Sequence, residues 1–336
     1  MQQEQLTFEG NGVGRWCSLE TLSWVRIAGS DAVRFVDSFT TAAVGKLSDG
    51  QGTESFFADV KGQVICMAGL LRLGPGRGEE PAVEIVVDGE VGSSLAEHLE
   101  RYHIREPIEI EDVSAGRRTW ALFGEGVLAA LNAVSAEPLD ESLLGDVFGH
   151  VAVSLACEGR PVAARLVRCD WAGEACWLLV SAAGDADVVA QALAAAGLVA
   201  CEPTDWERRC IEAGTPRLCD IVPKTLPQEL GRDARAISFT KGCYLGQETV
   251  ARLDALGHVN RRLVGLAVAG DVVPEVGAAI TSGSDTVGQV TSRCFSKVLG
   301  KPLVLAILPV KALSAEAPLA VGGVAAVVVT LPVAAS

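Results

Sequence analysis

The apolar stretches of this chain are short, rich in β-branched residues, and interrupted by glycine and proline. The stretch at 317–335, APLAVGGVAAVVVTLPVAA, shows all three features. A membrane-spanning helix needs about 20 predominantly apolar residues in a row, whereas short β-branched runs bounded by turn residues are typical of buried strands. The pattern therefore predicts a globular protein built largely on strands, without a transmembrane segment.

Length and charge limit the partners of such a protein. The chain has 336 residues, of which 49% are hydrophobic and 21% charged, which suits two or three folded units. Its formal net charge of −14 repels phosphate backbones and anionic lipids, so we expect neither a direct nucleic-acid partner nor membrane binding. The N-terminal residues show no basic patch followed by an apolar run, which predicts a cytoplasmic protein, and we expect a monomer.

The ten cysteines are scattered along the chain without a CxxC motif or a repeated spacing. The four histidines include no pair with the spacing of ligands on one helix face. These patterns predict no metal site, and they favour reduced thiols that are mostly buried as small apolar side chains.

The order of predicted elements divides the chain into three parts. Residues 1–115 read as an α+β half with a hairpin turn at 60–63, in an order that contains a split βαβ arrangement. Residues 116–258 begin with a similar order and continue into a segment, from about 204, that we expect to wrap over the sheets. Residues 259–336 contain short β-rich runs separated by turn residues, which predicts a small antiparallel barrel. The expected fold is thus α+β, with two ferredoxin-like (split βαβ) halves and a C-terminal β-barrel.

One segment, SFTKGCYLGQETVAR at 238–252, concentrates chemically active side chains. Good helix formers predict a helix at 247–256 with Gly257 as its C-cap. Cys243 then lies on the loop before the helix, where Lys241 and unpaired helix amides favour thiolate over thiol. Gln247 and Glu248 in the first turn are placed to bind a polar ligand. The alternative is a purely structural turn in which Cys243 is buried and Glu248 caps the helix.

This segment also carries a family resemblance. KGCYLGQE, with ISF upstream and VARLDALGHVNRRLVGL downstream, resembles the signature of the YgfZ family of folate-binding proteins. These are relatives of the glycine-cleavage aminomethyltransferase (T-protein) and include mitochondrial iron–sulphur assembly factors. Weaker similarity covers 39–64, 208–221, 226–230 and 286–308. The resemblance implies a tripartite architecture around a central pocket for tetrahydrofolate or a one-carbon derivative of it.

The resemblance also implies which residues contact the folate. VRCDWAGEACWLLV, at 167–180, is similar to the T-protein segment R-C-G-Y-T-G-E-D, whose glutamate holds the pterin ring. This places Glu174 as the pterin-binding carboxylate, Trp171 as an aromatic wall and Arg168 at the upstream arginine. The alternative is an exposed hairpin turn. In the signature loop, the candidate cofactor contacts are Lys241, Tyr244, Gln247, Glu248 and Arg252.

Two of these loop residues have simpler alternatives. Lys241 either faces the glutamate tail of folate or only solvates the loop. Arg252 lies one helical turn after Glu248, so the two either form an ordinary intrahelical ion pair or use that pair to hold Glu248 beside Cys243.

The chain departs from the transferase pattern where the T-protein has its acidic pair, G-G-x-x-D-D. The aligned stretch is KGQVICMAG, which places Ile65, Cys66 and Met67 at those positions. Asp59 lies earlier and is not a clear substitute. The arginine of R-x-E-A-G is displaced as well, because Cys210 stands two residues before Glu212. Aminomethyl transfer needs a group that steers or accepts a proton during C–N cleavage, so the departures favour a binding factor over an enzyme.

Three functions follow from these observations. The leading hypothesis is a tetrahydrofolate-binding protein that supports assembly or repair of iron–sulphur enzymes and affects tRNA modification indirectly, with Cys243 as its functional thiol. The second is a folate-dependent aminomethyltransferase. The third, direct RNA binding, is suggested only by Arg261, Arg262 and the ERR triplet at 207–209, which the net charge makes a solvated surface instead.

Overall fold

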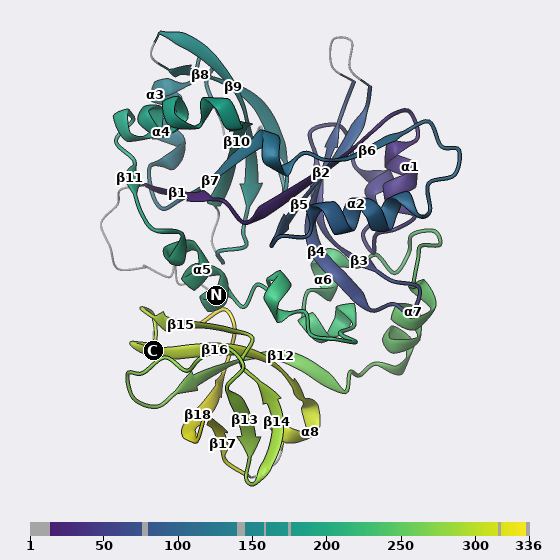
Figure 1. Ribbon diagram of the computed structural model, residues 1–336, viewed down its shortest axis with the longest axis vertical. Helices are drawn as coiled ribbons and strands as arrows, with labels where there is room; N and C mark the ends of the chain where they lie inside the picture. The colour runs from purple at the N-terminus through teal and green to yellow at the C-terminus, as the bar shows by residue number, and fades with distance from the viewer. Residues whose placement is uncertain are drawn as a thin grey trace, which may run out of the picture.

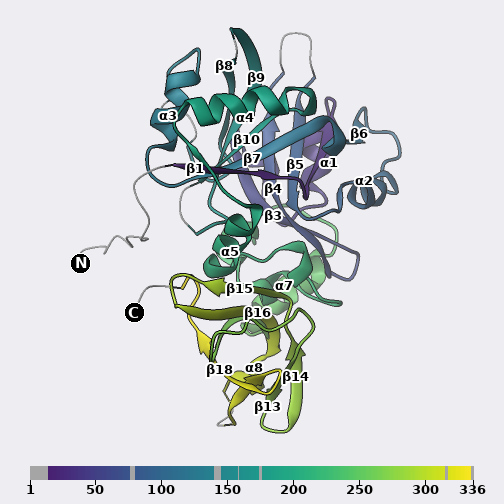
Figure 2. The same ribbon diagram turned by 60° about the vertical axis from the view of Figure 1, so that its left-hand side comes forward.

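The computed structural model describes residues 14–75, 80–139, 145–157, 159–173, 176–314 and 317–333. Two β-sheets lie side by side in the upper part of Figure 1, and a third, C-terminal sheet lies below them. A segment with several short helices runs between the upper and lower parts, and Figure 2 shows the same separation from another side. None of the helices in these ranges combines the length and the apolarity needed to cross a membrane.

The first sheet has the strand order β3-β4-β5-β2-β6, with every neighbouring pair antiparallel. Two helices cover one face, where Phe35 and Leu95 are buried. Strand β5 is buried on both faces because side chains alternate along a strand: Val83 and Ile85 contact the helices, and Val86 faces the second sheet. The bounds are β2 (Leu22–Ala28), α1 (Ala32–Asp37), β3 (Gly52–Ala58), β4 (Val64–Leu73), β5 (Ala82–Asp88), α2 (Gly92–Glu100) and β6 (Glu109–Asp112).

The second sheet has the order β11-β1-β7-β10-β9-β8, and its helices bury Leu131 and Leu193 on the outer face. Strand β1 precedes the first sheet in sequence but pairs with β7 and β11, so the chain crosses between the halves before it builds the first sheet. The bounds are β1 (Arg15–Leu19), β7 (Arg117–Phe123), α3 (Val127–Val134), β8 (His150–Cys157), β9 (Arg160–Cys169), β10 (Cys176–Ala182), α4 (Ala186–Ala195) and β11 (Val199–Ala200).

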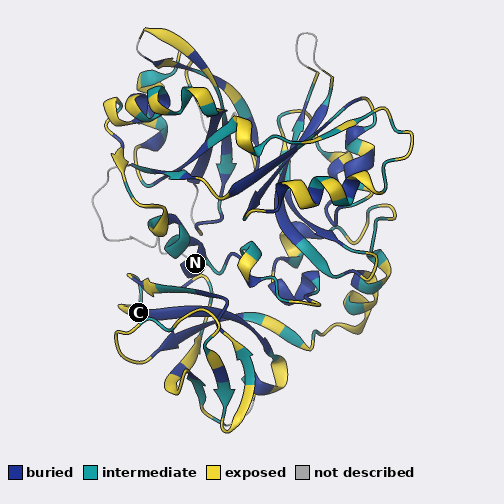
Figure 3. Ribbon diagram, in the orientation of Figure 1, coloured by how far each residue is buried: buried dark blue, intermediate teal, exposed yellow. Residues whose placement is uncertain are grey.

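The inner faces of the two sheets share one large apolar cluster. Figure 3 shows the buried strands at the centre and the exposed outer surfaces of the covering helices. At the centre of this contact, Phe148 adopts a left-handed backbone conformation with φ 67°. A Cβ atom on Gly69 would lie 2.1 Å from the Phe148 ring, and one on Gly52 would lie 2.2 Å from the Phe148 carbonyl oxygen. Glycine at both positions therefore permits the close approach of the two halves.

A buried carboxylate adds a charged tie between the sheets. Glu84 on β5 is 1% exposed and forms ion pairs with Arg26 of the first sheet and with Arg117 and Arg165 of the second. Burial alone would raise the pKa of Glu84, but the hydrogen bonds and charge of Arg117, followed by the other two guanidinium groups, lower it. The carboxylate therefore stays ionised and linked to both halves.

The segment after residue 200 runs between the two upper sheets and the C-terminal sheet. It contains α5 (Pro203–Ala213), α6 (Asp233–Ala236) and α7 (Gln247–Leu256), with short 3₁₀ turns at Leu218–Asp220 and Pro227–Leu230. Helix α5 begins at a proline and ends at Gly214 in the left-handed conformation, which are common features of helix starts and ends.

The C-terminal sheet has the order β14-β13-β17-β18-β12-β16-β15 and curls on itself, so the expected barrel is a curled antiparallel half-barrel. Gly288 on β14 lies against β16, where a Cβ would come 2.4 Å from the Leu308 side chain. The mixed α and β architecture is confirmed, while the ferredoxin-like description of each upper half stays a prediction. The bounds are β12 (Arg261–Val268), β13 (Ala279–Ser282), β14 (Asp285–Gln289), β15 (Ser292–Ser296), β16 (Lys301–Pro309), α8 (Val310–Leu313), β17 (Leu319–Val321) and β18 (Val324–Val329).

The contact between the halves should make stability depend on pH through His150. Its amide donates to the Gly50 carbonyl (2.9 Å), and burial lowers its pKa from the ordinary 6.5 to about 4. The unfolded chain then binds a proton that the folded chain excludes, so stability falls as pH drops through this window. Between about pH 7 and about pH 5 we expect His150 to account for a loss of about 2 kcal/mol.

Urea unfolding of the wild type and of His150→Gln at both pH values measures this contribution. The wild type should lose more free energy of unfolding than the variant on acidification. Equal losses in the two proteins would contradict the assignment.

Candidate functional site

Lys241 anchors the signature loop to the first half. Its Nζ donates to the carbonyl oxygens of Asp37 (2.6 Å), Thr40 (2.8 Å) and Ala42 (2.6 Å), and it lies 3.2 Å from Asp37 Oδ1. The side chain is only 2% exposed, so the alternative in which Lys241 only solvates the loop is wrong, while contact with the glutamate tail of folate stays a prediction. Burial lowers the pKa of Lys241, an effect opposed by the charge of Asp37. The ammonium is therefore held by the first half of the chain, and its predicted effect on the Cys243 thiol stays a prediction.

Two glycines let the loop pack on the β3–β4 turn. A Cβ on Gly246 would lie 2.5 Å from the Asp59 carbonyl oxygen, and one on Gly62 would lie 2.8 Å from Thr249 Cβ. Both glycines have positive φ, 80° and 75°. The contact is thus backbone against backbone, and together with Lys241 it fixes the course of the loop.

Helix α7 covers Gln247–Leu256 and ends at Gly257 in the left-handed conformation, which confirms the helix expected at 247–256. Cys243 is exposed just before it, so the expectation of a loop thiol is confirmed and the alternative of a buried structural cysteine is wrong. Tyr244 is half-buried; the Lys241 ammonium lies 5.3 Å from its ring centroid, and burial raises its pKa to about 12.

The remaining candidates in α7 differ in their surroundings. Gln247 Oε1 accepts a hydrogen bond from the Tyr244 amide (3.3 Å), which makes Gln247 a local cap of the loop. Glu248 and Arg252 are both exposed. Within the described part of the chain no salt bridge joins Glu248 to Arg252, so the expected ion pair is not formed.

The proposed pterin-binding stretch lies in the central core. Trp171 is 1% exposed, stacks edge-on against Phe148 (5.4 Å between ring centroids) and donates from Nε1 to Glu54 (3.3 Å). Arg168 is half-buried and its guanidinium donates to the Gly145 carbonyl (2.5 Å). Glu174 lies outside the described residues. Trp171, the expected aromatic wall of the pterin site, therefore packs against other residues of the protein.

The sequence reasoning missed a buried ion pair beside Trp171. Arg232 forms two bonds to Glu54 on β3, 2.7 Å from Nε and 2.6 Å from Nη2, and Glu54 is only 3% exposed. Glu54 belongs to the first half, Arg232 to the wrapping segment and Trp171 to the second half, so all three parts meet at the Glu54 carboxylate. No local pattern indicates it, because the two partners lie 178 residues apart.

The positions of the transferase carboxylates are apolar and buried. Cys66 and Met67 on β4 are 0% and 6% exposed, and burial raises the pKa of the Cys66 thiol to about 12. Ile65 packs against the helix-covered core. Asp59 Oδ1 accepts the amides of Lys61 (2.8 Å) and Gln63 (2.9 Å), so this carboxylate closes the hairpin turn.

The displaced arginine also has a defined place. Cys210 occupies the motif position and is fully buried in the central cluster. The Arg209 guanidinium lies over the Phe123 ring at 4.6 Å, a cation–π contact. Arg208 instead pairs with Glu212 (2.6 Å) and Asp205 (3.0 Å) on the same helix.

A tetrahydrofolate would need buried hydrogen-bond partners for its amino and ring nitrogens. Asp170 Oδ1 and Trp206 Nε1 are buried and have no partner in the described structure, which provides one acceptor and one donor. Trp206 also borders a hollow of about 280 Å³ next to Leu19 and Arg217. In chemical type, one free acceptor and one free donor match what a pterin requires. Among the described residues, no cluster of three or more His, Cys, Asp or Glu side chains is arranged to hold a metal ion.

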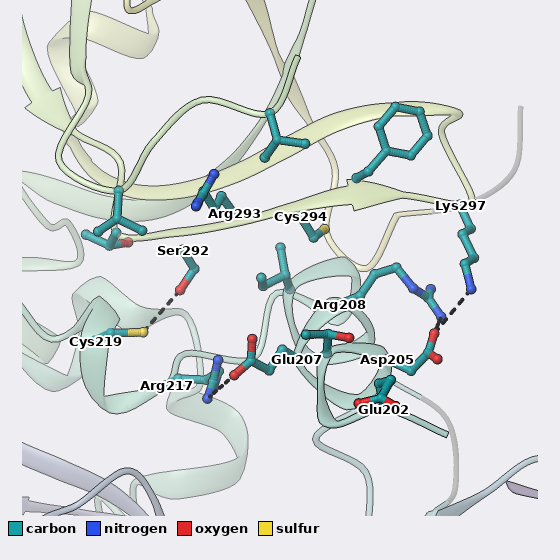
Figure 4. Close-up of a pocket in the computed structure, with 16 residues that line it drawn as sticks. Glu202, Asp205, Glu207, Arg208, Arg217, Cys219, Ser292, Arg293, Cys294 and Lys297 are labelled. Carbon is teal, nitrogen blue, oxygen red and sulfur yellow. Dashed lines mark hydrogen bonds and ion pairs between the residues drawn. The ribbon is translucent and has the colours of Figure 1, made fainter. Parts of the chain in front are cut away.

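A larger cavity, of about 730 Å³, lies between α5 and the C-terminal strand β15 (Figure 4). Its walls carry paired charges: Arg217 binds Glu207, and Arg208 and Lys297 bind Asp205. Its described lining includes Glu207 and Arg208 of the ERR triplet but none of the candidate folate contacts and not Cys243.

We expect Lys241→Met to lower the free energy of unfolding by about 1–3 kcal/mol, because it leaves buried carbonyl oxygens without a donor. Lys297→Met provides a matched control, since Lys297 is 66% exposed in an ion pair and its loss should change stability by less than about 1 kcal/mol. Urea unfolding of both variants measures the difference. Equal stabilities of the two variants would show that the ammonium does not hold the loop.

Comparison with known proteins places this geometry in a family. The C-terminal residues 261–334 match the glycine cleavage T-protein C-terminal barrel domain. An aminomethyltransferase of Thermus thermophilus is 30% identical over 83% of this chain and 75% of its own length. The tRNA-modifying protein YgfZ of Vibrio vulnificus is 26% identical over 73% of this chain and 67% of its own length. A chloroplastic Arabidopsis thaliana protein named as a transferase is 27% identical over 80% of this chain, but the match spans only 59% of that protein.

The fold has a solved counterpart. The aminomethyltransferase T of the Bartonella henselae glycine cleavage system superposes with a TM-score of 0.77 at 19% identity, covering 96% of this chain and 86% of the other. The two structures therefore share the arrangement of two upper sheets and a C-terminal half-barrel. The 30% identity to the Thermus aminomethyltransferase shows that the chain belongs to the aminomethyltransferase family, within the superfamily that also contains the YgfZ proteins.

Proposed function

We propose that this protein binds a tetrahydrofolate or a one-carbon derivative and supports assembly or repair of iron–sulphur enzymes in the cytoplasm. Its partners under this proposal are the folate and iron–sulphur client or assembly proteins, and any effect on tRNA modification is indirect. The net charge of −14 favours an indirect effect, because it opposes close contact with RNA. The name of the Vibrio relative, a tRNA-modifying protein, is consistent with this proposal.

The observation that carries the proposal is the apolar strand at the transferase carboxylate positions. A general acid or base must exchange a proton with the substrate, and the buried Cys66 thiol, with a pKa raised to about 12, stays protonated near neutral pH. Asp59 is nearby in sequence, but its Oδ1 is engaged by two backbone amides. Binding without aminomethyl transfer is therefore the function that these residues favour.

The folate would lie at the contact between the sheets. Trp206 Nε1 and Asp170 Oδ1 supply an unpartnered donor and acceptor, and Glu174 follows Asp170 closely in the sequence. Arg168 and Trp171 help to position the chain at Asp170 through their contacts with Gly145 and Glu54. The bound folate would supply the one-carbon chemistry, while these residues bind and orient it.

The second candidate is a folate-dependent aminomethyltransferase. The identity to the Thermus aminomethyltransferase favours it. Formation of methylene-tetrahydrofolate from an aminomethyl donor by the purified full chain would support this candidate against the first.

Titration of tetrahydrofolate into the full chain in a calorimeter tests the binding. We expect saturable binding that Glu174→Gln weakens about tenfold or more, because a carboxylate with two hydrogen bonds to a pterin contributes about 1.5–3 kcal/mol. Glu125→Gln, at an exposed glutamate, is the matched control and should bind as the wild type does. Absence of heat in the wild type, or equal affinity of both variants, would contradict the proposed pocket.

Cys243 is tested in a strain that lacks the gene. The wild-type chain should restore the activities of iron–sulphur enzymes, whereas Cys243→Ala should leave them near the level of the deletion. Cys219→Ala removes another exposed thiol and should rescue fully. Full rescue by Cys243→Ala would show that the exposed thiol has no role.

A further inference from the structure

Half of the cysteines gather in one place. Five of the ten lie in the central cluster or pack against it. They are Cys17, Cys169, Cys176, Cys201 and Cys210. The sequence gives no sign of this because the five are spread from β1 to α5, and no folate contact proposed above uses a thiol. Two neighbouring pairs within the group differ sharply in their access to solvent.

The first pair consists of Cys17 and Cys201, which are neighbours across two parallel strands. Strand β1 pairs with β11 so that Trp16 lies opposite Ala200 at the end of the pairing, and Cys17 and Cys201 are the residues that follow these two in the chain. The Cys201 amide continues the ladder by donating to the Trp16 carbonyl (2.9 Å). Neighbouring strands lie about 4.8 Å apart, within the range of about 4.4–6.8 Å between the Cα atoms of disulfides. Both side chains contact the same core, so they lie on the same side of the sheet.

The thiols of Cys17 and Cys201 differ in solvent exposure and in pKa. Cys17 is 1% exposed, and the Cys201 thiol donates to the Trp16 carbonyl oxygen (3.4 Å). The neighbouring Cys17 thiol is the main cause that lowers the pKa of Cys201, with smaller help from the charges of Arg15 and Arg209 and opposition from burial and from Asp205. Cys201 is only partly buried, so a small oxidant can reach it. Cys17 is placed to attack second.

We propose that Cys201 and Cys17 form a reversible disulfide when the protein meets a hydroperoxide. The Cys201 sulfur attacks one peroxide oxygen, the O–O bond breaks, and an alcohol or water leaves as Cys201 becomes a sulfenic acid. The Cys17 sulfur then attacks the Cys201 sulfur, the S–S bond forms, and water leaves. The two thiols lose two electrons and two protons in total, which reduce the hydroperoxide. A thiol reductant restores both side chains by exchange.

The position of the disulfide gives it a structural effect. Cys201 lies between β11 and α5, two residues before the helix begins at Pro203. Helix α5 carries Trp206 and Cys210 in the central cluster, and its Arg208 borders the cavity of about 730 Å³ seen in Figure 4. A covalent bond at this point would tie the start of α5 to β1 and restrict its movement relative to the second sheet.

The second pair provides an internal control. Cys169 and Cys176 lie directly opposite each other on β9 and β10, and burial raises the pKa of the Cys169 thiol. Both are 0% exposed. The two cysteines are therefore neighbours in the sheet, as Cys17 and Cys201 are, but neither can be reached by solvent, whereas Cys201 can. We expect this pair to stay reduced under conditions that oxidise Cys17 and Cys201.

The experiment treats the reduced full chain with one equivalent of hydrogen peroxide and maps the thiols by alkylation and mass spectrometry. The expected result is a loss of two hydrogen atoms, a peptide in which Cys17 is linked to Cys201, and reversal by dithiothreitol. Cys201→Ser, at the partly exposed position, should abolish the link and leave Cys17 open to alkylation. Cys243→Ser, at an exposed thiol on the distant loop, should leave the link unchanged.

Cys17→Ser separates the two steps, and its circular dichroism shows whether it folds. In the folded variant, Cys201 should accumulate as a sulfenic acid that a cyclic diketone traps. The proposal is overturned if Cys17 and Cys201 stay open to alkylation while Cys243 is oxidised, or if Cys169 and Cys176 form the disulfide instead. Should Cys17→Ser not fold, the result with Cys201→Ser decides alone.

Discussion

The buried pair of Glu54 and Arg232 is the interaction on which the arrangement of the three upper segments depends. Two buried charges are costly to desolvate, and the cost is offset here because the guanidinium binds both carboxylate oxygens, at 2.7 and 2.6 Å, and Trp171 donates a third bond. Each group comes from a different segment: β3, the start of α6 and the turn after β9. Removal of either Glu54 or Arg232 would leave the other charged group buried without its ion-pair partner. The pair therefore sets where the wrapping segment lies against both sheets.

Hydrogen bonds connect the segment that carries Arg232 to the signature loop. Thr41 donates to the Ala236 carbonyl (2.6 Å), and the Ser238 amide donates to the Thr41 carbonyl (2.9 Å), so α6 and the loop are attached to the same stretch of the first half as Lys241. The result is an exposed thiol on a firmly held backbone. The proposed function assigns this thiol to a protein partner and assigns the folate to a separate place, at Asp170 and Trp206.

The sequence predicts the features that depend on neighbouring residues. The helix at 247–256 with its Gly257 cap and the turn at 60–63 were predictable because helix formers, glycine and alternating apolar residues act locally. The partners of Lys241 were not predictable, since its three carbonyl acceptors lie 199–204 residues earlier. The same holds for Glu54 with Arg232. Trp171 matched a family motif, but only the packing around Phe148 shows that its ring is enclosed.

The membership of β1 in the second sheet has a consequence for how the chain is made. Strand β1 leaves the ribosome before the first sheet, yet it lies between β7 and β11, which follow only after the whole first sheet has been synthesised. The first sheet can complete its own pairing on the nascent chain, whereas β1 must wait with its apolar face unpaired. Pairings between such distant segments form slowly and close last. During synthesis, the second half is therefore the part of the molecule most in need of a chaperone.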